Sequence, residues 1–403
     1  MSAAQNVTSR RVFYIPGYDP IHPRRYRELY RTESAEQARI SGYEISQSPK
    51  KVGDGPYGWH VDAKIDGQDV HADVDVLLWS DIVRKSMNIS VPQAYWLLIR
   101  TAWIYISSGS LWRLMRLRKG PLIAALYPIG MLALQLVLAL IAGYLVGSIV
   151  AAFAHPILGV IASWPVIAAI LRWFKKNDNK FYAYYLMHDY SYSSATRGAN
   201  PVDLENRMKE FSDTVAEALL SDVDEVLIVG HSYGAHIGVS ILADLYRQDR
   251  IPADGPAVAL LSLGHVIPMV SFLPEAKRLR ADLRFLSEKE HVTWVDVTAP
   301  GDGCAFALCD PVAVSGVATQ DQRWPLVFSA AFTQSLSAEK WKEMRWKFFQ
   351  LHFQYLCAFD RPKDYDYFQI TAGPMTLRDR YKGRSSSKSM KTQPQSPYSD
   401  MAS

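Results

Sequence analysis

The stretch VDEVLIVGHSYGAHIGVSILADLYR, residues 223–247, decides the fold. Residues 224–229 form a short apolar run rich in valine and isoleucine, which is typical of a buried central strand. Residues 235–246 then change to the spacing of a helix with one apolar face. The sequence Gly230-His231-Ser232-Tyr233-Gly234 between them therefore lies at a strand-to-helix junction.

A G-x-S-x-G sequence at such a junction indicates a nucleophilic serine. A sharp turn leaves little room for side chains, which accounts for Gly230 and Gly234. The turn lifts the hydroxyl of Ser232 above the sheet, and the following helix offers free N–H groups to a developing negative charge. We therefore expect Ser232 to be the nucleophile and the N–H of Tyr233 to stabilise an oxyanion. A plain turn with a capping serine is the alternative interpretation.

In this context the sequence resembles the α/β-hydrolase family. The resemblance implies an α/β fold with a mostly parallel sheet flanked by helices. It also implies an acid and then a histidine, in that chain order, downstream of Ser232. The resemblance covers roughly residues 11–20, 74–80 and 224–370, and it is strongest at the G-x-S-x-G turn.

A second oxyanion donor is expected after an early strand, as in that family. Val12 to Ile15 predicts a short strand, and Pro16-Gly17-Tyr18 ends it. Gly17 lets the backbone turn tightly, and Pro16 has no N–H to donate. The N–H of Tyr18 is therefore the candidate donor, although a simple loop after a strand would have the same sequence.

A serine hydroxyl is a weak nucleophile until a base, itself held by a carboxylate, takes its proton. His265 and His291 follow Ser232 but precede the candidate acids. The family order places the base after the acid, which leaves His352. Without the upstream motif, His352 would be interpreted as an ordinary histidine on an apolar helix.

Three carboxylates precede His352 in WVDVTAPGDGCAFALCDP, residues 294–311. Asp296 lies within a predicted strand at 291–297. Asp302 lies in a turn just beyond the strand, where the acid of the triad is expected, and Asp310 opens a later turn. We favour Asp302 as the acid and keep Asp310 as second choice. A plain turn aspartate is the alternative for Asp302.

The segment from Pro121 to Leu171 contains no Asp, Glu, Lys or Arg. Because one membrane span needs about 20 apolar residues, this segment predicts two transmembrane helices. They are expected near residues 122–144 and 150–171. Gly147-Ser148 and His155-Pro156 both interrupt the pattern, so either is a candidate turn. A buried helical pair that caps the active site is the alternative.

Basic residues flank both ends of this segment: Arg116, Arg118 and Lys119 before it, and Arg172, Lys175 and Lys176 after it. Positive charges remain on the cytoplasmic side, so both ends of the hairpin and the catalytic parts are expected in the cytoplasm. Residues 92–118 are apolar and aromatic with a basic end, which is typical of an interfacial amphipathic helix. We therefore expect an integral protein of the inner or plasma membrane.

The totals exclude several other classes of protein. The chain has 403 residues and a net charge of +4, which is not typical of a nucleic-acid binder. Its three cysteines, Cys304, Cys309 and Cys357, cannot all pair and lack a CxxC spacing, which favours a reducing compartment. The N-terminus lacks the apolar core of a signal peptide. We expect neither a metal nor an organic cofactor.

The chain is expected to divide into five segments. They are a flexible N-terminus (1–10), the first part of the hydrolase core with a membrane-proximal helix (11–120), a transmembrane hairpin (121–171), the main core with the catalytic residues (172–381), and a disordered tail (382–403). Further strands are expected near 74–79 and 257–263, and a strand or hairpin within 42–73. The first strands of the family's usual eight-stranded sheet look absent, because the chain starts almost at the strand that precedes Gly17.

The expected function is that of a membrane-anchored serine hydrolase, esterase-like or lipase-like, that cleaves ester bonds through an acyl-enzyme. Its expected partners are an apolar acyl or lipid-like ester and the lipid bilayer. An acyltransferase or thioesterase with the same triad, and a non-catalytic membrane scaffold on the same fold, remain alternatives. The oligomeric state stays open.

Overall fold

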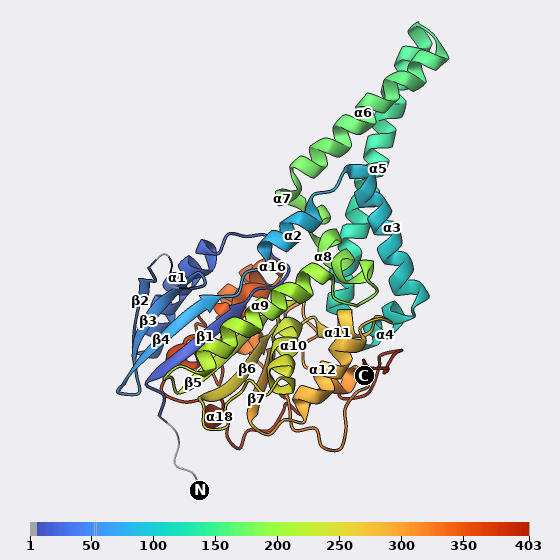
Figure 1. Ribbon diagram of the computed structural model, residues 1–403. Helices are drawn as coiled ribbons and strands as arrows, with labels where there is room; N and C mark the ends of the chain where they lie inside the picture. Colours follow the sequence, from blue (N-terminus) through green and yellow to red (C-terminus); the bar gives the residue numbers. More distant parts are fainter. Residues whose placement is uncertain (1–5, 52, 54, 403) are drawn as a thin grey trace.

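Strands rich in apolar residues build the centre of the molecule. The computed structural model describes residues 6–51, 53 and 55–402. These residues form an eight-stranded sheet in the order β2-β3-β4-β1-β5-β6-β7-β8 (Figure 1). The strands are β1 (Ser9–Ile15), β2 (Glu44–Pro49), β3 (Gly58–Ile65), β4 (Gln68–Val76), β5 (Glu225–His231), β6 (Ala257–Leu263), β7 (Val292–Thr298) and β8 (Leu326–Ser329).

The sheet is mixed but mostly parallel. β3 pairs antiparallel with β2 and β4, whereas the pairs from β4 through β1 to β8 are parallel. Every residue of β5 and β7 is buried, as expected for central strands covered on both faces. At the edge, the residues of β2 are exposed or only half-buried. The protein therefore belongs to the α/β class.

The strands predicted at 224–229, 257–263 and 291–297 correspond to β5, β6 and β7. Two expectations are wrong. The strand expected at 74–79 begins and ends earlier, as β4, because exposed polar residues alternate with buried ones in its first half. The first strands of the sheet, expected to be absent, are present, since β2 and β3 form one side of the sheet and follow the first helix of the chain.

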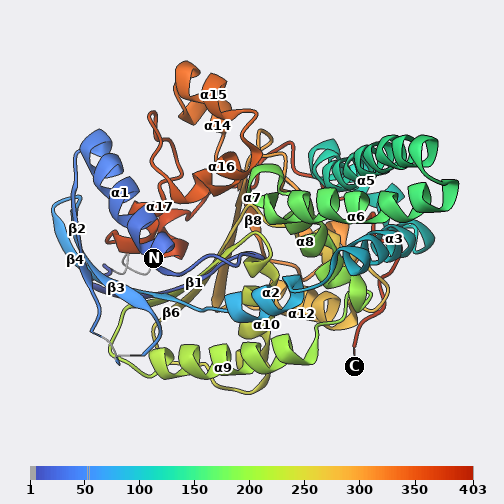
Figure 2. The same cartoon turned by 90° about the horizontal axis from the view of Figure 1, so that it is seen from above.

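Helices cover both faces of the sheet (Figure 2). One face carries α2 (Ser80–Met87), α9 (Val202–Leu219), α10 (Gly234–Arg247) and α12 (Lys277–Ser287), and the other carries α1 (Arg24–Ser41), α16 (Phe348–His352) and α17 (Tyr367–Ala372). Side chains of β1 alternate between the two cores. Phe13 and Ile15 pack in the core under α9 and α10, whereas Val12 and Tyr14 pack in the core under α1 and α17.

The remaining helices lie mainly at the carboxyl ends of the parallel strands or near the C-terminus. They are α3 (Val91–Ser107), α4 (Ser110–Leu117), α5 (Lys119–Phe153), α6 (Pro156–Lys176), α7 (Asp178–Phe181), α8 (Ala183–Ala195), α11 (Ile267–Ser271), α13 (Pro311–Val314), α14 (Phe332–Ser335), α15 (Ala338–Met344), a 3₁₀ turn η1 (Phe353–Leu356) and α18 (Leu377–Arg380).

α5 and α6 form an antiparallel pair that projects from the rest of the molecule (Figure 1). Both helices are long and apolar enough to cross a membrane, and few of their side chains are buried. The turn between them lies at Ala154-His155, and His155 caps α6 by accepting a hydrogen bond from the N–H of Ile157. The expected span limits of 122–144 and 150–171 are therefore both wrong, since α5 continues through Gly147-Ser148 and α6 begins only at Pro156 and ends at Lys176.

Gly147 serves helix packing and not a turn. A Cβ at this position would lie 2.2 Å from the Oγ of Ser163 and 2.7 Å from the carbonyl oxygen of Gly159, both in α6. A Cβ at Gly159 would lie 2.4 Å from the carbonyl oxygen of Gly147. Small residues thus allow the two backbones to approach closely, which is a common arrangement of membrane helices.

The N-terminal segment from Asn6 onward is fixed to the core, so the expected flexibility of residues 1–10 is wrong there. Val7 is buried, and Arg10 lies in β1. The Nε of Arg10 lies 2.6 Å from a carboxylate oxygen of Glu225 in β5. Its other two nitrogens donate to the carbonyl oxygens of Gly373 and Met375, so each nitrogen of the buried guanidinium has a hydrogen-bond partner. Residues 1–5 lie outside the described part of the chain.

The C-terminal segment 382–402 also differs from the disordered tail expected there. The guanidinium of Arg280 pairs with Asp400 at 2.9 Å, and the N–H of Asp310 donates to the carbonyl oxygen of Lys391 at 3.0 Å. These contacts join residues far apart in the sequence. Local composition therefore indicates a segment without helix or strand, but it does not reveal the surface that holds the segment in place.

We expect Gly147→Ala to lower the midpoint of thermal unfolding in detergent, because its Cβ meets the backbone of α6. Overpacking of this kind costs about 1–3 kcal/mol. Gly130→Ala is the matched control in the same helix, because a Cβ there meets nothing within 4 Å. Equal midpoints for the two variants would contradict the packing described here.

Candidate active site

The turn between β5 and α10 places Ser232 in a strained conformation. The φ angle of Ser232 is 56°, a left-handed value that costs energy in a residue other than glycine. A Cβ at Gly230 would lie 2.6 Å from the Cα of Ala235, and one at Gly234 would lie 2.1 Å from the carbonyl oxygen of Ile15. Side chains at 230 and 234 would collide with backbone, so the turn requires both glycines.

The backbone after β1 passes directly beside Ser232. A Cβ at Gly17 would lie 2.9 Å from the Cβ of Ser232 and 3.4 Å from its Oγ. The indole of Trp79 donates to the carbonyl oxygen of Pro16 at 2.9 Å, and the hydroxyl of Tyr185 donates to that of Tyr18 at 2.6 Å. These bonds fix the Gly17-Tyr18 backbone next to Ser232.

Tyr233 directly follows the serine in the chain. It is the N-cap of α10, whose first N–H groups have no acceptor within the helix. Its ring is buried against Trp79, and its hydroxyl accepts a hydrogen bond from Ser193 at 3.1 Å. The structure thus brings Gly17, Tyr18 and Tyr233 together around Ser232.

An acid–base pair lies at the same edge of the sheet. The Nδ1 of His352 lies 2.7 Å from the Oδ2 of Asp302, and both side chains are buried. The hydroxyl of Tyr355 donates to the same oxygen at 3.0 Å, and the N–H of Cys304 donates to the other at 2.9 Å. Burial would raise the pKa of Asp302, but His352 and these donors outweigh burial and lower it. Asp302 is therefore ionised and fixes a proton on the Nδ1 of His352.

Asp310, the second choice for the acid, has another role. Its Oδ1 accepts hydrogen bonds from the N–H groups of Val312 and Ala313 and so caps α13. Its Oδ2 accepts from Gln322 at 2.8 Å. Asp302 and not Asp310 therefore contacts His352.

His231 is a site residue that the sequence did not reveal. Its Nε2 lies 2.9 Å from the carbonyl oxygen of His352, and the two rings are 4.7 Å apart. Burial, with a contribution from His352, lowers the pKa of His231 to about 3. A neutral His231 donates from Nε2 and holds the backbone of His352. No pattern in the sequence distinguishes this role, because the position is variable within the motif.

Tyr355 was also missed as a partner of Asp302. It follows His352 by three residues, a spacing that places two side chains on neighbouring sides of a helical segment. That spacing is the signal that the sequence offered. Tyr355 fixes the carboxylate from the side opposite Cys304, so the acid is held by three separate donors.

A cavity of about 320 Å³ opens beside Ser232 and His352. Its wall is mainly apolar, and α3, α4, the first turns of α5, and α8 supply most of it. Val266 and Met269, from the segment after β6, also line it. Ile106 of α3 and Leu126 of α5 line the cavity yet are 46% and 50% exposed, so the mouth lies between these two helices.

Ser232 and His352 share this cavity. The described residues include no hydrogen bond between the Oγ of Ser232 and the Nε2 of His352, whose Nδ1 is bonded to Asp302. Hydrogen bonds of this kind are often long in unliganded proteins and tighten when substrate binds. The arrangement can support proton transfer from the serine once a substrate fills the cavity.

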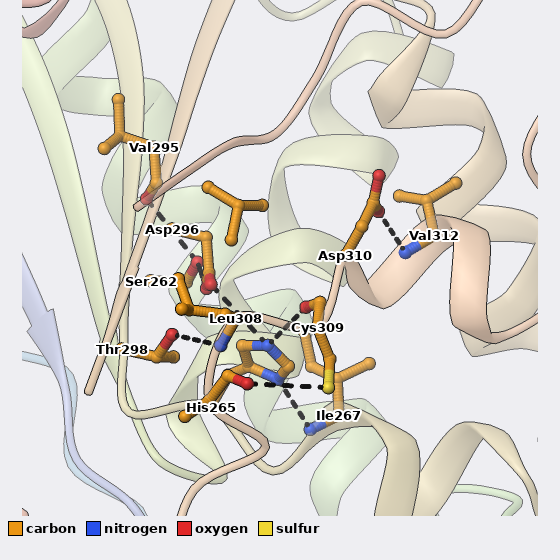
Figure 3. Close-up of polar contacts among 12 residues, drawn as sticks. Ser262, His265, Ile267, Val295, Asp296, Thr298, Leu308, Cys309, Asp310 and Val312 are labelled. Atoms are coloured by element: carbon orange, nitrogen blue, oxygen red, sulfur yellow. Dashed lines mark hydrogen bonds and ion pairs between the residues drawn. The ribbon is translucent and has the colours of Figure 1, made fainter. Parts of the chain in front are cut away.

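A second cluster of Ser, His and Asp lies deeper in the core (Figure 3). The Oδ1 of Asp296 lies 2.5 Å from the hydroxyl of Ser262. The Oδ2 of Asp296 lies 3.6 Å from the Nε2 of His265. The three side chains are fully buried, so no substrate reaches them. Burial raises the pKa of Asp296 well above its usual value and lowers that of His265 to about 4. Both shifts favour the neutral form of the group, as does the full burial of the cluster, so the cluster is structural.

Two groups among the described residues have donor atoms close enough to hold a metal ion. In the first, His60, His71 and Asp73 lie on β3 and β4, where His60 pairs with Asp73 at 2.5 Å and His71 with Asp62 at 2.7 Å. These contacts match ordinary cross-strand pairs at a half-exposed surface.

The second group is Asp302, Cys304 and His352. The oxygens of Asp302 are already taken by three hydrogen-bond donors, as described above. Burial raises the pKa of the Cys304 thiol well above its usual value, so the thiolate that would bind a metal is disfavoured. This group therefore fits an acid–base pair and does not fit a metal site.

We expect Asp296→Asn to make stability less dependent on pH. In the unfolded chain an aspartate ionises near pH 3.9, whereas folded Asp296 keeps its proton to a higher pH. Unfolding then releases a proton. As the pH rises, the free energy of unfolding of the wild type therefore falls by up to about 1.4 kcal/mol per pH unit relative to the variant. Thermal unfolding of both proteins between about pH 5 and about pH 8 measures the difference. A constant difference across this range would contradict a neutral Asp296.

Comparison with protein-family models gives no match. Searches of the curated proteins and of the solved structures also give none. The case for any function therefore rests on the geometry of the site itself.

Proposed function

We propose that the chain is a serine hydrolase of the α/β-hydrolase type that cleaves ester bonds through an acyl-enzyme. One observation carries the proposal. Ser232, held in a left-handed turn at the end of a central strand, shares an apolar cavity with the hydrogen-bonded pair His352 and Asp302. The side chains occur in the chain order Ser, Asp, His, which the resemblance requires.

In the first half of the proposed reaction, the Oγ of Ser232 attacks the ester carbonyl while the Nε2 of His352 accepts its proton. The negative charge on the carbonyl oxygen is stabilised by the N–H groups of Tyr233 and Tyr18, and Gly17 leaves the space for this approach. One such donor contributes about 3 kcal/mol. The bond between the carbonyl carbon and the alcohol oxygen then breaks, and His352 returns the proton to the leaving alcohol.

In the second half, water attacks the acyl-enzyme. His352 accepts a proton from the water and delivers it to Ser232 as the acid is released. Asp302 stays ionised throughout, keeps the imidazole in the productive tautomer and stabilises its charged form. His231 and Tyr355 act through His352 and Asp302, so they are positioning residues. This chemistry needs neither a metal nor an organic cofactor.

The cavity and its surroundings favour an apolar acyl substrate. The mouth lies between α3 and α5, and these two helices also carry the exposed apolar side chains Trp103 and Ile123, which are 69% and 62% exposed. In our proposal α5 and α6 cross the membrane, and the basic residues at both ends of the hairpin keep the catalytic part in the cytoplasm. A lipid-like ester would then reach Ser232 from the bilayer without crossing water.

Acyl transfer and thioester hydrolysis use the same residues, and they differ from ester hydrolysis only in the acceptor or in the leaving group. A non-catalytic scaffold fits less well. Such a protein would have no need for the strained φ of Ser232 or for the three donors that fix Asp302. We therefore favour an enzyme, and within the enzymes an esterase.

A fluorophosphonate probe tests the nucleophile. We expect it to label the wild-type protein and not Ser232→Ala, because only an activated serine reacts. Ser240→Ala is the matched control, since the buried Oγ of Ser240 in α10 has no hydrogen-bond partner among the described residues and its removal costs little. An unlabelled wild-type protein, or equal labelling of Ser232→Ala, would refute the proposed function.

The membrane arrangement has its own test. We expect the full chain to remain with membranes after an alkaline carbonate wash, and a reporter fused after Ser403 to show a cytoplasmic location. The physical reason is that basic residues flank both ends of the hairpin. Release by carbonate would exclude spanning helices, and a reporter on the opposite side would exclude the proposed orientation.

A further inference from the structure

Most polar groups on the wall of the cavity are bonded to other protein groups. The hydroxyl of Tyr105 donates to the carbonyl oxygen of Met269 at 3.0 Å, and that of Tyr18 lies 2.6 Å from the hydroxyl of Ser86. The hydroxyls of Tyr185, Tyr190 and Thr101 also have protein partners. These groups hold the wall together and are not free to bind a substrate.

Asp189 of α8 is different. It lines the cavity together with Ser232 and His352 and keeps part of its surface open to it. Among the described residues, its carboxyl group has no hydrogen bond and no ion pair. It therefore joins Ser232 Oγ and His352 Nε2 as a polar group that the cavity leaves without a partner.

An isolated carboxylate in an apolar site costs free energy. Burial raises the pKa of Asp189 to about 7, although His352 nearby lowers it in part. The other titratable groups that interact with it are tyrosines and a cysteine: Tyr18, Tyr105, Tyr185, Tyr190, Tyr233 and Cys304. The acid does not help to hold the fold together, and such groups in a cavity usually serve a ligand.

We propose that Asp189 binds a free hydroxyl on the alcohol portion of the substrate, so that the substrate is an acyl ester of a polyol, such as a monoacylglycerol. The assignment rests on the proposed function. The apolar wall formed by α3, α4 and α5 accommodates the acyl chain, and Asp189 is the one free acceptor among the described charged groups on the wall, apart from the acid–base pair.

A hydroxyl fits this site better than a cationic group. A hydroxyl both donates and accepts, so it matches a carboxyl group in either protonation state. A bound ammonium would require the ionised acid. It would also lie near His352, which becomes positively charged as it accepts the serine proton, and the repulsion would oppose the reaction.

The test compares kcat/KM for monodecanoylglycerol and for propyl decanoate, which is the same ester without the free hydroxyls. Both are presented in the same detergent micelles. We expect the wild type to prefer the glycerol ester by about tenfold, the value of one hydrogen bond to a buried polar group. The preference should disappear in Asp189→Leu and persist in part in Asp189→Asn, whose amide still donates and accepts.

Asp203→Leu serves as control, because Asp203 lies on α9 in an exposed pair with Lys85. It should keep the wild-type preference. Asp189→Leu should also unfold at a higher temperature than the wild type, because a carboxyl group without a hydrogen-bond partner among the described residues is removed from an apolar cavity. This second readout does not require activity. If the Leu variant does not fold, the partial loss in Asp189→Asn carries the test.

The outcomes separate this assignment from the proposed function. A wild type that fluorophosphonate does not label would overturn both. The role of Asp189 alone would be overturned if the wild type is labelled and active but both Asp189→Leu and Asp189→Asn keep its full preference for monodecanoylglycerol over propyl decanoate. If the wild type prefers a choline ester to propyl decanoate and Asp189→Leu loses this preference, the group that Asp189 binds is a cation and not a hydroxyl.

Discussion

The rest of the structure depends on a close backbone crossing where β1 and β5 end and α10 begins. Gly234 lies against the carbonyl oxygen of Ile15, at a distance that admits no Cβ, and Gly17 lies against Ser232. The crossing joins Ser232, the proposed nucleophile, to the Gly17-Tyr18 segment, which is proposed to supply the second N–H donor. It also forces Ser232 into a left-handed conformation. This conformation is unfavourable in conformational energy, and the surrounding backbone holds the residue in it. Two separate parts of the proposed site are thus positioned by one steric constraint.

The acid–base pair has a different origin. Asp302 follows β7, and His352 ends a short helix after β8, so their meeting depends on the whole parallel half of the sheet. His231 joins the two systems, because it adjoins Ser232 in the chain and holds the backbone of His352. Helices also take part in the site, because α3, α4, α5 and α8 form most of the wall of the cavity. α3 and the first turns of α5, which is itself one helix of the hairpin, form its mouth, so the proposed chemistry and the proposed membrane contact share the same walls.

Sequence patterns predicted the elements that carry strong periodicity. The strands at 224–229, 257–263 and 291–297 and the long apolar pair of helices all correspond to observed elements. The strands β2 and β3 at one side of the sheet were harder to predict. They mix polar with apolar residues, and so their sequence periodicity is weak. The tail at 382–402 was judged by its composition, which says nothing of the distant groups, such as Arg280, that hold it.

By itself the sequence determined the turn that carries Ser232, since glycine spacing and the change from strand to helix are local properties of the chain. It also determined the uncharged hairpin and proposed Asp302 and His352 in their order. Only the tertiary structure decided that Asp302 and not Asp310 contacts His352, that His231 and Tyr355 hold this pair, and that Asp189 faces the cavity unpaired. The reason is physical: hydrogen bonds and burial depend on which distant segments meet, and periodicity in a chain does not encode those meetings.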